Sequence, residues 1–326
     1  MVTVIIPNYN HETFLKGRID SVLNQTYRDF KVIILDDCST DNSRDIIEQY
    51  RGHEKVSLII FNEKNSGSTF KQWKKGLGLA KSDWIWIAES DDLCAPDFLE
   101  LLVNQIHEGI SLVTCRTEQI DENGSLLQPG YFLADDVQTG RWHADFENSG
   151  IDEVNLALKY RCTIPNASAV IFHKTLTKNV EESLGFRAAG DWFFWINCLI
   201  EANVKFVAQP LAFHRFHSQT TRSQKSVDQE KCRMHEFLAC IDLAHKKLYS
   251  SNKRNRIDLK QYDWVYYELY QRGFRLNEVL HYKNIPLKFA CGYWRYINKR
   301  TKRFKKISLK IKLKTKNYLK RALTLR

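Results

Sequence analysis

The sequence predicts an α/β protein built on a mostly parallel sheet with helices on both faces, followed by a helical C-terminal region. Two observations support this fold class. Short apolar runs that suit buried strands alternate with amphipathic segments of helical period over the first 115 residues. Hydrophobic residues make up 43% and charged residues 27% of the 326-residue chain, which is the composition of a globular protein with a sizeable core.

The individual elements follow from local patterns in chain order. The β-branched run 2–6, closed by Pro7, predicts a first buried strand. Apolar side chains at helical spacing over 12–23 predict the first helix. The alternation continues with strands at 31–35, 56–61 and 84–88 and helices at 41–50 and 69–80. Beyond an irregular stretch at 116–165, we expect strands at 170–173 and 205–207, an aromatic helix at 191–199 and mostly helices over 227–297.

Positive charge is concentrated at the C-terminal end of the sequence. The formal net charge is +11, and residues 299–326 hold 13 Lys or Arg and no acid, so residues 1–298 carry a net charge of −2. Such asymmetry predicts a polyanionic partner for the tail and not for the body. Together with the element pattern it predicts three regions: an α/β domain at 1–220, a helical region at 221–298 and a basic tail at 299–326.

The cysteine and hydropathy patterns indicate in which cellular compartment the protein resides. Eight cysteines are scattered without a CxxC pair, which signals neither a zinc ribbon nor a redox motif and suits buried side chains in a reducing compartment. The N-terminus lacks the features of a signal peptide, and no stretch approaches the roughly 18 apolar residues of a spanning helix. We therefore expect a cytoplasmic protein.

Polar residues gather where the predicted strands end. In open α/β sheets ligands bind outside the carboxyl ends of the strands, so these positions are candidate site residues. Asp36 and Asp37 follow the second strand, where a carboxylate can accept a hydrogen bond from a nucleobase N–H or a ribose hydroxyl. The alternative is a solvated turn in which Ser39 or Asp41 caps the next helix.

Three acids follow the fourth strand directly, in Glu89-Ser90-Asp91-Asp92. Carboxylates so close together at a buried strand end raise one another's pKa unless a cation is present. A divalent metal that takes hard oxygen ligands, Mg²⁺ or Mn²⁺, would relieve the repulsion and bridge to a diphosphate. The alternative is a turn that caps the helix starting near Pro96.

Two further motifs lie later in the chain. Asp191 opens the aromatic segment GDWFFWIN, where it is either a helix N-cap or a general base tuned by apolar neighbours. His214, Arg215 and His217 follow a strand and a Pro-containing turn. A lone histidine is usually structural, but this group can supply a metal ligand and a phosphate contact.

Two phosphate-binding motifs are missing from the sequence. GLGLAK at 76–81 lacks the third glycine of a dinucleotide fingerprint and lies at the end of a predicted helix, not after a strand. No GxxxxGK[ST] sequence occurs, which excludes a P-loop at the level of motifs.

Taken in order, the four motifs resemble those of glycosyltransferase family 2, whose members have the GT-A fold. The opening VTVIIPNYNHETFLKGRIDSVLNQTYRDFKVIILDDCSTDNS is similar to that family's N-terminal half, and NSGS followed by WIWIAESDD is similar to its next block. The resemblance covers about residues 1–220. It implies an inverting transferase that uses a nucleoside-diphosphate sugar.

The resemblance implies a donor site at the strand ends. The nucleoside pocket would be lined by Pro7, Tyr9, Asp36 and Asp37. Asp37 would contact the base, and Glu89 and Asp91 would also meet the donor. The arginine that family members usually carry on the helix after the glycine is absent, so the implied phosphate contact passes to Lys71, Lys74 or Lys75.

The resemblance also implies metal ligands and a catalytic base. Asp91 and Asp92 fall on the family's DxD region, which holds the metal and the diphosphate. The first acid of that region is Glu89, one methylene longer than the usual Asp, and we favour Asp92 as the metal ligand. His217 falls on a late histidine that ligates metal in some members, and Asp191 falls on the catalytic base.

The implied reaction is a single displacement at the anomeric carbon, dependent on Mn²⁺ or Mg²⁺, with a glycan or lipid-linked acceptor of capsule or O-antigen type. No QxxRW sequence and no membrane spans occur, which favours one transfer per encounter over processive synthesis. A nucleotidyltransferase that makes nucleotide sugars is an alternative, but it needs a Gly-rich loop where this chain has PNYNHE. A non-catalytic membrane- or nucleic-acid-binding protein is a third hypothesis, which rests on the tail alone.

The basic tail predicts a peripheral position at the inner face of the cell membrane. Lys and Arg side chains attract an anionic leaflet, where a lipid-linked acceptor would reside. ISLKIKLK suits a strand, whereas Phe304, Ile307 and Ile311 fall near one helical face, so the conformation stays open. A disordered, solvated tail is the alternative. The body offers no matching basic face, which argues against nucleic acid.

Overall fold

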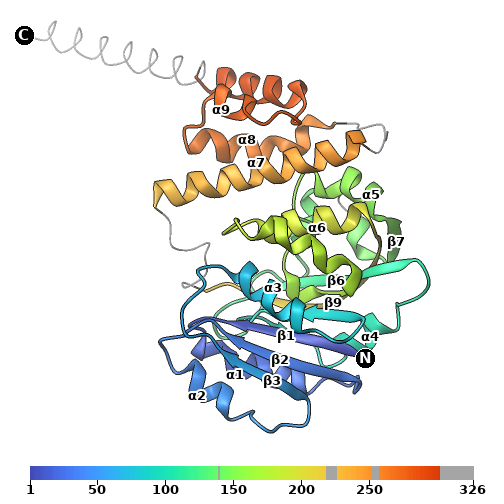
Figure 1. The fold of residues 1–326 in the computed structure, drawn as a ribbon. Helices are drawn as coiled ribbons and strands as arrows, with labels where there is room; N and C mark the ends of the chain where they lie inside the picture. The colour runs from blue at the N-terminus through green and yellow to red at the C-terminus, as the bar shows by residue number, and fades with distance from the viewer. Residues whose placement is uncertain (139, 218–225, 251–256, 302–326) are drawn as a thin grey trace, which may run out of the picture. The chain divides into compact units, whose positions relative to one another are not determined.

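The computed structural model describes residues 1–138, 140–217, 226–250 and 257–301 (Figure 1). The chain divides into two compact units, Met1–Arg256 and Ile257–Arg326. Among the described residues, no helix combines the length and the hydropathy that crossing a membrane requires. Most of the predicted basic tail, residues 302–326, lies outside the described residues.

In the described part of the chain, the first unit is built on a nine-stranded sheet whose first half has the predicted parallel pattern. β1 (Val2–Asn8) lies between β2 (Phe30–Asp36) and β4 (Trp84–Ile87) and is parallel to both. β3 (Val56–Phe61) extends the sheet beyond β2, also in parallel. Because Asn8 is in register with Asp36, the chain leaves β1 and β2 at the same edge of the sheet.

The second half makes the sheet mixed. β8 (Val170–His173) runs antiparallel between β4 and β6 (Ile110–Ile120), and β9 (Asn203–Arg215) runs parallel to β6. β5 (Leu93–Cys94) and β7 (Phe146–Ser149) pair antiparallel with β9. The strand expected at 205–207 is therefore longer than predicted. Pro210 does not end it, because the register between β6 and β9 shifts there and a bulged strand tolerates proline.

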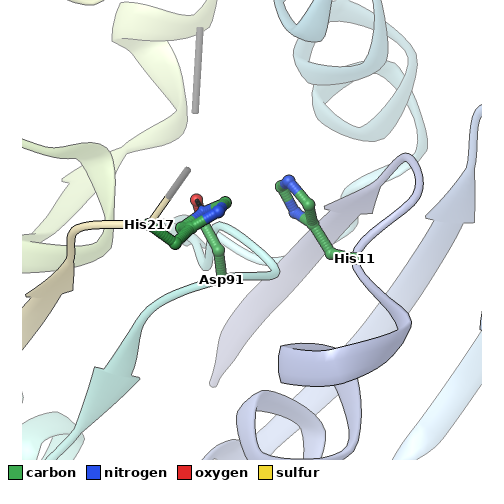
Figure 2. Close-up of side chains that lie close together, drawn as sticks. All are labelled: His11, Asp91 and His217. Atoms are coloured by element: carbon green, nitrogen blue, oxygen red, sulfur yellow. Dashed lines mark hydrogen bonds and ion pairs between the residues drawn. The ribbon is translucent and has the colours of Figure 1, made fainter. Parts of the chain in front are cut away.

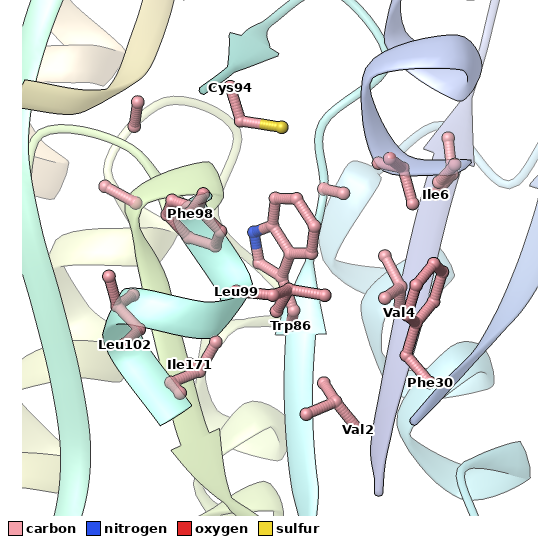
Figure 3. Close-up of a cluster of buried hydrophobic side chains, with 14 of the residues drawn as sticks. Val2, Val4, Ile6, Phe30, Trp86, Cys94, Phe98, Leu99, Leu102 and Ile171 are labelled. Atoms are coloured by element: carbon pink, nitrogen blue, oxygen red, sulfur yellow. The ribbon is translucent and has the colours of Figure 1, made fainter. Parts of the chain in front are cut away.

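Helices cover both faces of this sheet, as predicted. On one face, α1 (Glu12–Leu23), α2 (Ser43–Glu48) and α4 (Phe98–Val103) share a hydrophobic core with the side chains of β1 that point to that face. Figure 3 shows this core around Trp86, whose ring stacks on Phe98 with centroids 4.4 Å apart. α3 (Thr69–Leu79) lies on the other face, against Ile5 (Figure 1).

The close approach of α3 to the sheet predicts that alanine substitutions at two of its glycines have opposite effects on stability. A Cβ on Gly76 would lie 2.4 Å from Ile5 Cγ2, whereas a Cβ on Gly78 would have nothing within 4 Å. We expect Gly76→Ala to lower the free energy of unfolding by about 1–3 kcal/mol through overpacking. Gly78→Ala is expected to raise it by about 0.5–1 kcal/mol through helix propensity. Urea denaturation measures both, and a stabilised Gly76→Ala protein would contradict this packing.

The rest of the first unit carries several shorter elements and two longer helices. A helical stretch of α5 (Gly150–Glu153) and a π-helical turn at Val154–Leu158 follow β7. The two longer helices are α6 (Gly190–Ile200) and α7 (Val227–Ser250). Short 3₁₀ segments lie at Leu133–Asp136, Arg141–His143, Ala167–Ala169 and Lys174–Ser183.

The second unit is helical in its described residues. It contains a 3₁₀ turn at Leu259–Tyr262, α8 (Asp263–Gln271), α9 (Leu276–Leu280) and a helix over residues 287–301. Together with α7, these elements confirm the predicted helical C-terminal region.

Candidate active site

An open cleft of ≈ 1320 Å³ lies where β1, β2 and β4 end. Its walls come from segments far apart in the sequence: the loop after β1, the start of α3, the turn after β4, the starts of α6 and α7, and the end of β9. Parallel strands that end at one edge create this space, which is where ligands bind in α/β sheets.

The residues predicted to bind the nucleoside divide into two groups. The cleft is lined by Pro7, Tyr9 and Asp37. Asp36 is fully buried, and its carboxylate accepts hydrogen bonds from Asn8 Nδ2 (2.9 Å) and Ser39 Oγ (2.5 Å). Arg44 Nε lies 3.4 Å from the same carboxylate. Asp36 therefore holds the loop between β2 and α2 in place and is not among the residues that line the cleft.

The carboxylate of Asp37 is fixed by neighbours before any ligand binds. It accepts hydrogen bonds from Asn62 Nδ2 (2.7 Å) and Gln72 Nε2 (2.8 Å). The hydroxyl and the backbone N–H of Ser66 also donate to it. Gln72 lines the cleft beside it, although no motif in the sequence pointed to this residue.

The lysines expected to meet phosphate make other contacts. Lys71 Nζ donates to the carbonyl of Ser66 (2.9 Å), and Lys74 Nζ pairs with Glu181 (2.7 Å). Lys75 Nζ donates to Asn62 Oδ1 (2.5 Å). Within the described chain, none of these lysines lines the cleft, and the basic side chains that do so are Arg187, Arg215 and Arg233 together with His11 and His214.

Glu89 follows β4 and faces α3. Its carboxylate accepts a hydrogen bond from Trp73 Nε1 (2.7 Å), a partner that was not predicted. Burial and the negative charge of Asp91 raise the pKa of Glu89 to about 8. Both Glu89 and Trp73 line the cleft.

Asp91 meets two histidines that come from distant parts of the chain. Figure 2 shows His11, which follows β1, and His217, which follows β9, on either side of it. One candidate ligand atom from each of the three residues lies within 4.8 Å of the others. His217 Nε2 is 3.1 Å from Asp91 Oδ2, and His11 Nδ1 is 2.7 Å from Ser90 Oγ. Two imidazole nitrogens and one carboxylate oxygen fit a divalent transition metal such as Mn²⁺ better than Mg²⁺, which prefers oxygen ligands.

Asp92 is outside this cluster in the described chain. Its buried carboxylate accepts hydrogen bonds from the backbone N–H of Arg215 (3.0 Å) and from Asn166 Nδ2 (2.8 Å). The same carboxylate lies 3.2 Å from His214 Nδ1. Burial alone would raise the pKa of Asp92, but its electrostatic interactions with His214 and Arg18 hold it below its ordinary value. The geometry therefore favours Asp91, and not Asp92 as expected, as the carboxylate that can reach a metal.

A buried arginine lies behind the acids of the cleft. Arg18 on α1 is 0% exposed, and its guanidinium lies 5.0 Å from the centroid of the Trp86 ring. Burial raises the pKa of Glu89 and of Asp92, and the charge of Arg18 opposes that rise at both carboxyls. The sequence signal for this residue was a cation on the apolar face of the helix predicted at 12–23.

Asp191 is half-buried in the first turn of α6 and lines the cleft. The N-cap position belongs to Ala189, so the alternative hypothesis that Asp191 is the N-cap does not fit this helix. The start of α6 is held by α7, where the Glu236 carboxylate accepts from the backbone N–H groups of residues 187, 188 and 189, each at 2.8 Å. Cys240, one turn further along α7, donates to the carbonyl of Ala189 (3.5 Å). A Cβ on Gly190 would lie 2.5 Å from the Phe70 ring, so this turn also sits directly against α3.

The three bonds to Glu236 predict a large effect on stability. Glu236→Gln keeps the size but removes the charge at a helix N-terminus, and it points an amide N–H₂ toward N–H donors. We expect the free energy of unfolding to fall by about 2–3 kcal/mol. Lys246→Gln, an exposed change on the same helix, is the control and should stay within about 0.5 kcal/mol. Equal stability of the two variants in urea denaturation would show that the Glu236 contacts contribute little.

Comparison with known proteins gives matches over much of this chain. Residues 3–164 match the family described as "Glycosyl transferase family 2". The putative teichuronic acid biosynthesis glycosyltransferase TuaG of Bacillus subtilis is 36% identical over 100 residues, which are 31% of this chain and 39% of that protein. The poly(ribitol-phosphate) beta-N-acetylglucosaminyltransferase TarP of Staphylococcus aureus is 30% identical over 190 residues, 56% of this chain and 55% of that protein. The matched part of this chain thus spans 39% of TuaG and 55% of TarP, less than two thirds of either relative.

A solved structure matches over most of the chain. The crystal structure of S. aureus TarS 1–349 in complex with UDP-GlcNAc aligns with a TM-score of 0.58 and 17% sequence identity, covering 90% of this chain and 89% of that one. At this level of identity the similarity establishes a shared fold and nothing further.

Proposed function

The chain belongs to glycosyltransferase family 2, and on that premise we propose that it transfers one sugar per encounter from a nucleoside-diphosphate sugar to a hydroxyl of a glycan or lipid-linked acceptor, with inversion. The observation that carries this proposal is the convergence of the four motifs on one cleft. Asp37, Glu89, Asp91 and Asp191 line a single space, and His217 contacts Asp91. No one of these acids alone would indicate glycosyl transfer.

The proposed mechanism uses Asp191 as the general base. Its carboxylate takes the proton of the acceptor hydroxyl while that oxygen attacks the anomeric carbon. The bond from the anomeric carbon to the diphosphate oxygen breaks in the same step, so the configuration inverts and the nucleoside diphosphate leaves with the electron pair. The bonds from Glu236 to residues 187–189 support this role, because they hold the turn that carries Asp191 in one position.

The donor would lie along the ends of β1, β2 and β4. Tyr9, 45% exposed, and Pro7 offer surfaces for the nucleoside, and the fixed carboxylate of Asp37 offers an acceptor for an N–H of the base. Arg187 and Arg215 line the cleft and supply positive charge in place of Lys71.

We propose that Asp91 and His217, with His11, hold a divalent cation, for which their donor set favours Mn²⁺. When bound, such a cation would offset the negative charge of the departing diphosphate. Asp92 then has a supporting role, because its hydrogen bonds to Arg215 and Asn166 fix the turn that carries Asp91.

The acceptor is proposed to be a cell-surface glycan of capsule or O-antigen type on a lipid carrier, at the inner face of the cell membrane. TuaG and TarP are named for teichuronic acid and poly(ribitol-phosphate), which makes an anionic surface polymer a reasonable class to test. The membrane contact of the basic tail is part of the same proposal.

A panel of nucleotide sugars tests the proposal directly. The melting temperature of the full chain is measured with UDP-, dTDP- and GDP-linked sugars, each with Mn²⁺ and with chelator. We expect one base to stabilise the protein, and only in the presence of metal. Hydrolysis of the stabilising donor then serves as the first activity assay. The proposed function would be overturned if no nucleotide sugar stabilised the protein and the protein hydrolysed none of them.

A further inference from the structure

The helix over residues 287–301 has one face that is fixed within the second unit. Phe289 and Tyr293 are fully buried there. Tyr293 Oη donates to the carbonyl of Phe274 (2.8 Å), and Tyr266 Oη donates to the carbonyl of Phe289 (3.0 Å). A Cβ on Gly292 would lie 2.4 Å from Tyr266 Oη, so the helix lies directly against α8. These contacts determine which side chains the helix turns outward.

The outward face carries a stripe of apolar side chains. Leu287 is 70% exposed and Trp294 is 54% exposed, and Cys291 between them is also exposed. Their spacing of four and then three residues places them on one side of a helix. Large apolar side chains this exposed are normal when single, but a helical row of them marks an interaction surface.

Cations lie beside this stripe, and acids are missing from it. Lys288, Arg295 and Lys299 are exposed. Lys288 and Arg295 directly follow Leu287 and Trp294 of the stripe, and Lys299 lies one helical turn after Arg295. Residues 279–326 contain 16 Lys or Arg and no Asp or Glu. The described face therefore combines an apolar row with three cations and no acid, and a partner must complement both.

We propose that the face formed by Leu287, Lys288, Cys291, Trp294, Arg295 and Lys299 docks on an anionic lipid bilayer. Leu287 and the Trp294 indole enter the interfacial region, where amphipathic aromatic side chains are favoured, and the three cations lie at the level of the headgroups. This arrangement deepens the membrane contact in the proposed function and rests on it for the choice of partner. It differs from docking by the tail alone, because a folded helix supplies the apolar part.

Other occupants fit the face less well. A second copy of the chain would bring Lys288, Arg295 and Lys299 against the same cations in a two-fold interface, with no acid on the face to offset them. A nucleic acid would satisfy the cations but would leave Leu287 without an apolar partner. A bilayer of anionic lipids complements both parts of the surface.

Co-sedimentation with vesicles tests the inference and does not depend on sugar transfer. The full chain is mixed with vesicles of phosphatidylcholine alone or of phosphatidylcholine and phosphatidylglycerol at 7:3. We expect binding to the anionic vesicles only. The double variant Leu287→Gln/Trp294→Gln is expected to bind at least about tenfold more weakly, with the larger loss in high salt, where the apolar contacts carry the binding. Lys288→Gln/Arg295→Gln is expected to lose about tenfold in low salt and less in high salt.

The matched control is Leu126→Gln/Leu127→Gln, which makes the same kind of change at two exposed leucines of the first unit. It should bind vesicles as the wild type does, and all variants should melt within a few degrees of it. The proposal would be overturned if the Leu287→Gln/Trp294→Gln variant bound anionic vesicles as tightly as the wild type does. It would also be overturned if the wild type bound both kinds of vesicle equally. Loss of a dimer in this variant by light scattering, without any vesicle binding by the wild type, would assign the face to a second copy instead. If vesicle binding holds but no nucleotide sugar binds, the proposed function fails while this inference stands.

Discussion

Asp191→Asn is expected to slow sugar transfer by about 10²–10⁴-fold, the usual range for loss of a general base, while donor binding stays close to that of the wild type. The amide has the shape of the carboxylate but cannot take the acceptor proton. Single-turnover transfer with the donor found by the thermal screen measures the rate, and titration calorimetry measures donor affinity. Loss of rate with retained binding is the pattern of an interaction made only in the transition state.

Glu201→Gln is the matched control for this experiment. Glu201 lies just beyond the other end of α6 and makes an exposed ion pair with Lys178 (2.8 Å), which is worth at most about 1 kcal/mol. The control should transfer sugar at nearly the wild-type rate. An Asp191→Asn protein that also transfers at that rate would remove Asp191 from the mechanism, and the base would have to be sought among the other acids of the cleft.

Asp91→Asn is expected to weaken the Mn²⁺-dependent binding of UDP by at least about tenfold, or roughly 1.4 kcal/mol. The carboxylate of Asp91 is the charged member of the cluster with His11 and His217, so its loss removes most of the attraction for a cation. In chelator the same change removes a negative charge near the diphosphate, so it should not weaken binding. Calorimetry with UDP in both conditions separates the two effects. Binding should be stronger with Mn²⁺ than with Mg²⁺, because two of the three ligands are nitrogen.

Asp83→Asn provides the control for Asp91. Asp83 lies just before β4, at the opposite end of the same strand, and it is exposed and paired with Lys174 (2.5 Å). UDP affinity should not change in this variant. Suppose that the wild-type protein binds UDP as tightly in chelator as with Mn²⁺, and that the same holds for GDP. The cluster is then not a metal site, and the two histidines serve to position Asp91.

Much of the first unit could be predicted because its elements are locally encoded. The helix at 12–23 and the strands at 56–61 and 170–173 have the predicted bounds, since period-3.6 and period-2 patterns depend only on neighbours in the sequence. β9 was predicted too short, because a proline such as Pro210 normally indicates the end of a strand. Only the register shift between β6 and β9 shows that the strand continues past it. The mixed half of the sheet was missed for a similar reason, since strand direction depends on partners that are distant in sequence.

By itself, the sequence determined which strand ends carry polar residues, and it identified the family through their order along the chain. Tertiary structure alone decided which of these residues share a space. Asp36 and Asp37 are adjacent in sequence, yet one is buried at the end of β2 and the other lines the cleft, because successive side chains at a strand end point in opposite directions. His11 meets Asp91 only because β1 and β4 are neighbours in the sheet, and Glu236 reaches the turn before Asp191 only because α7 packs on α6. Local periodicity encodes the elements, whereas contacts across the chain depend on how those elements pack, which no local pattern records.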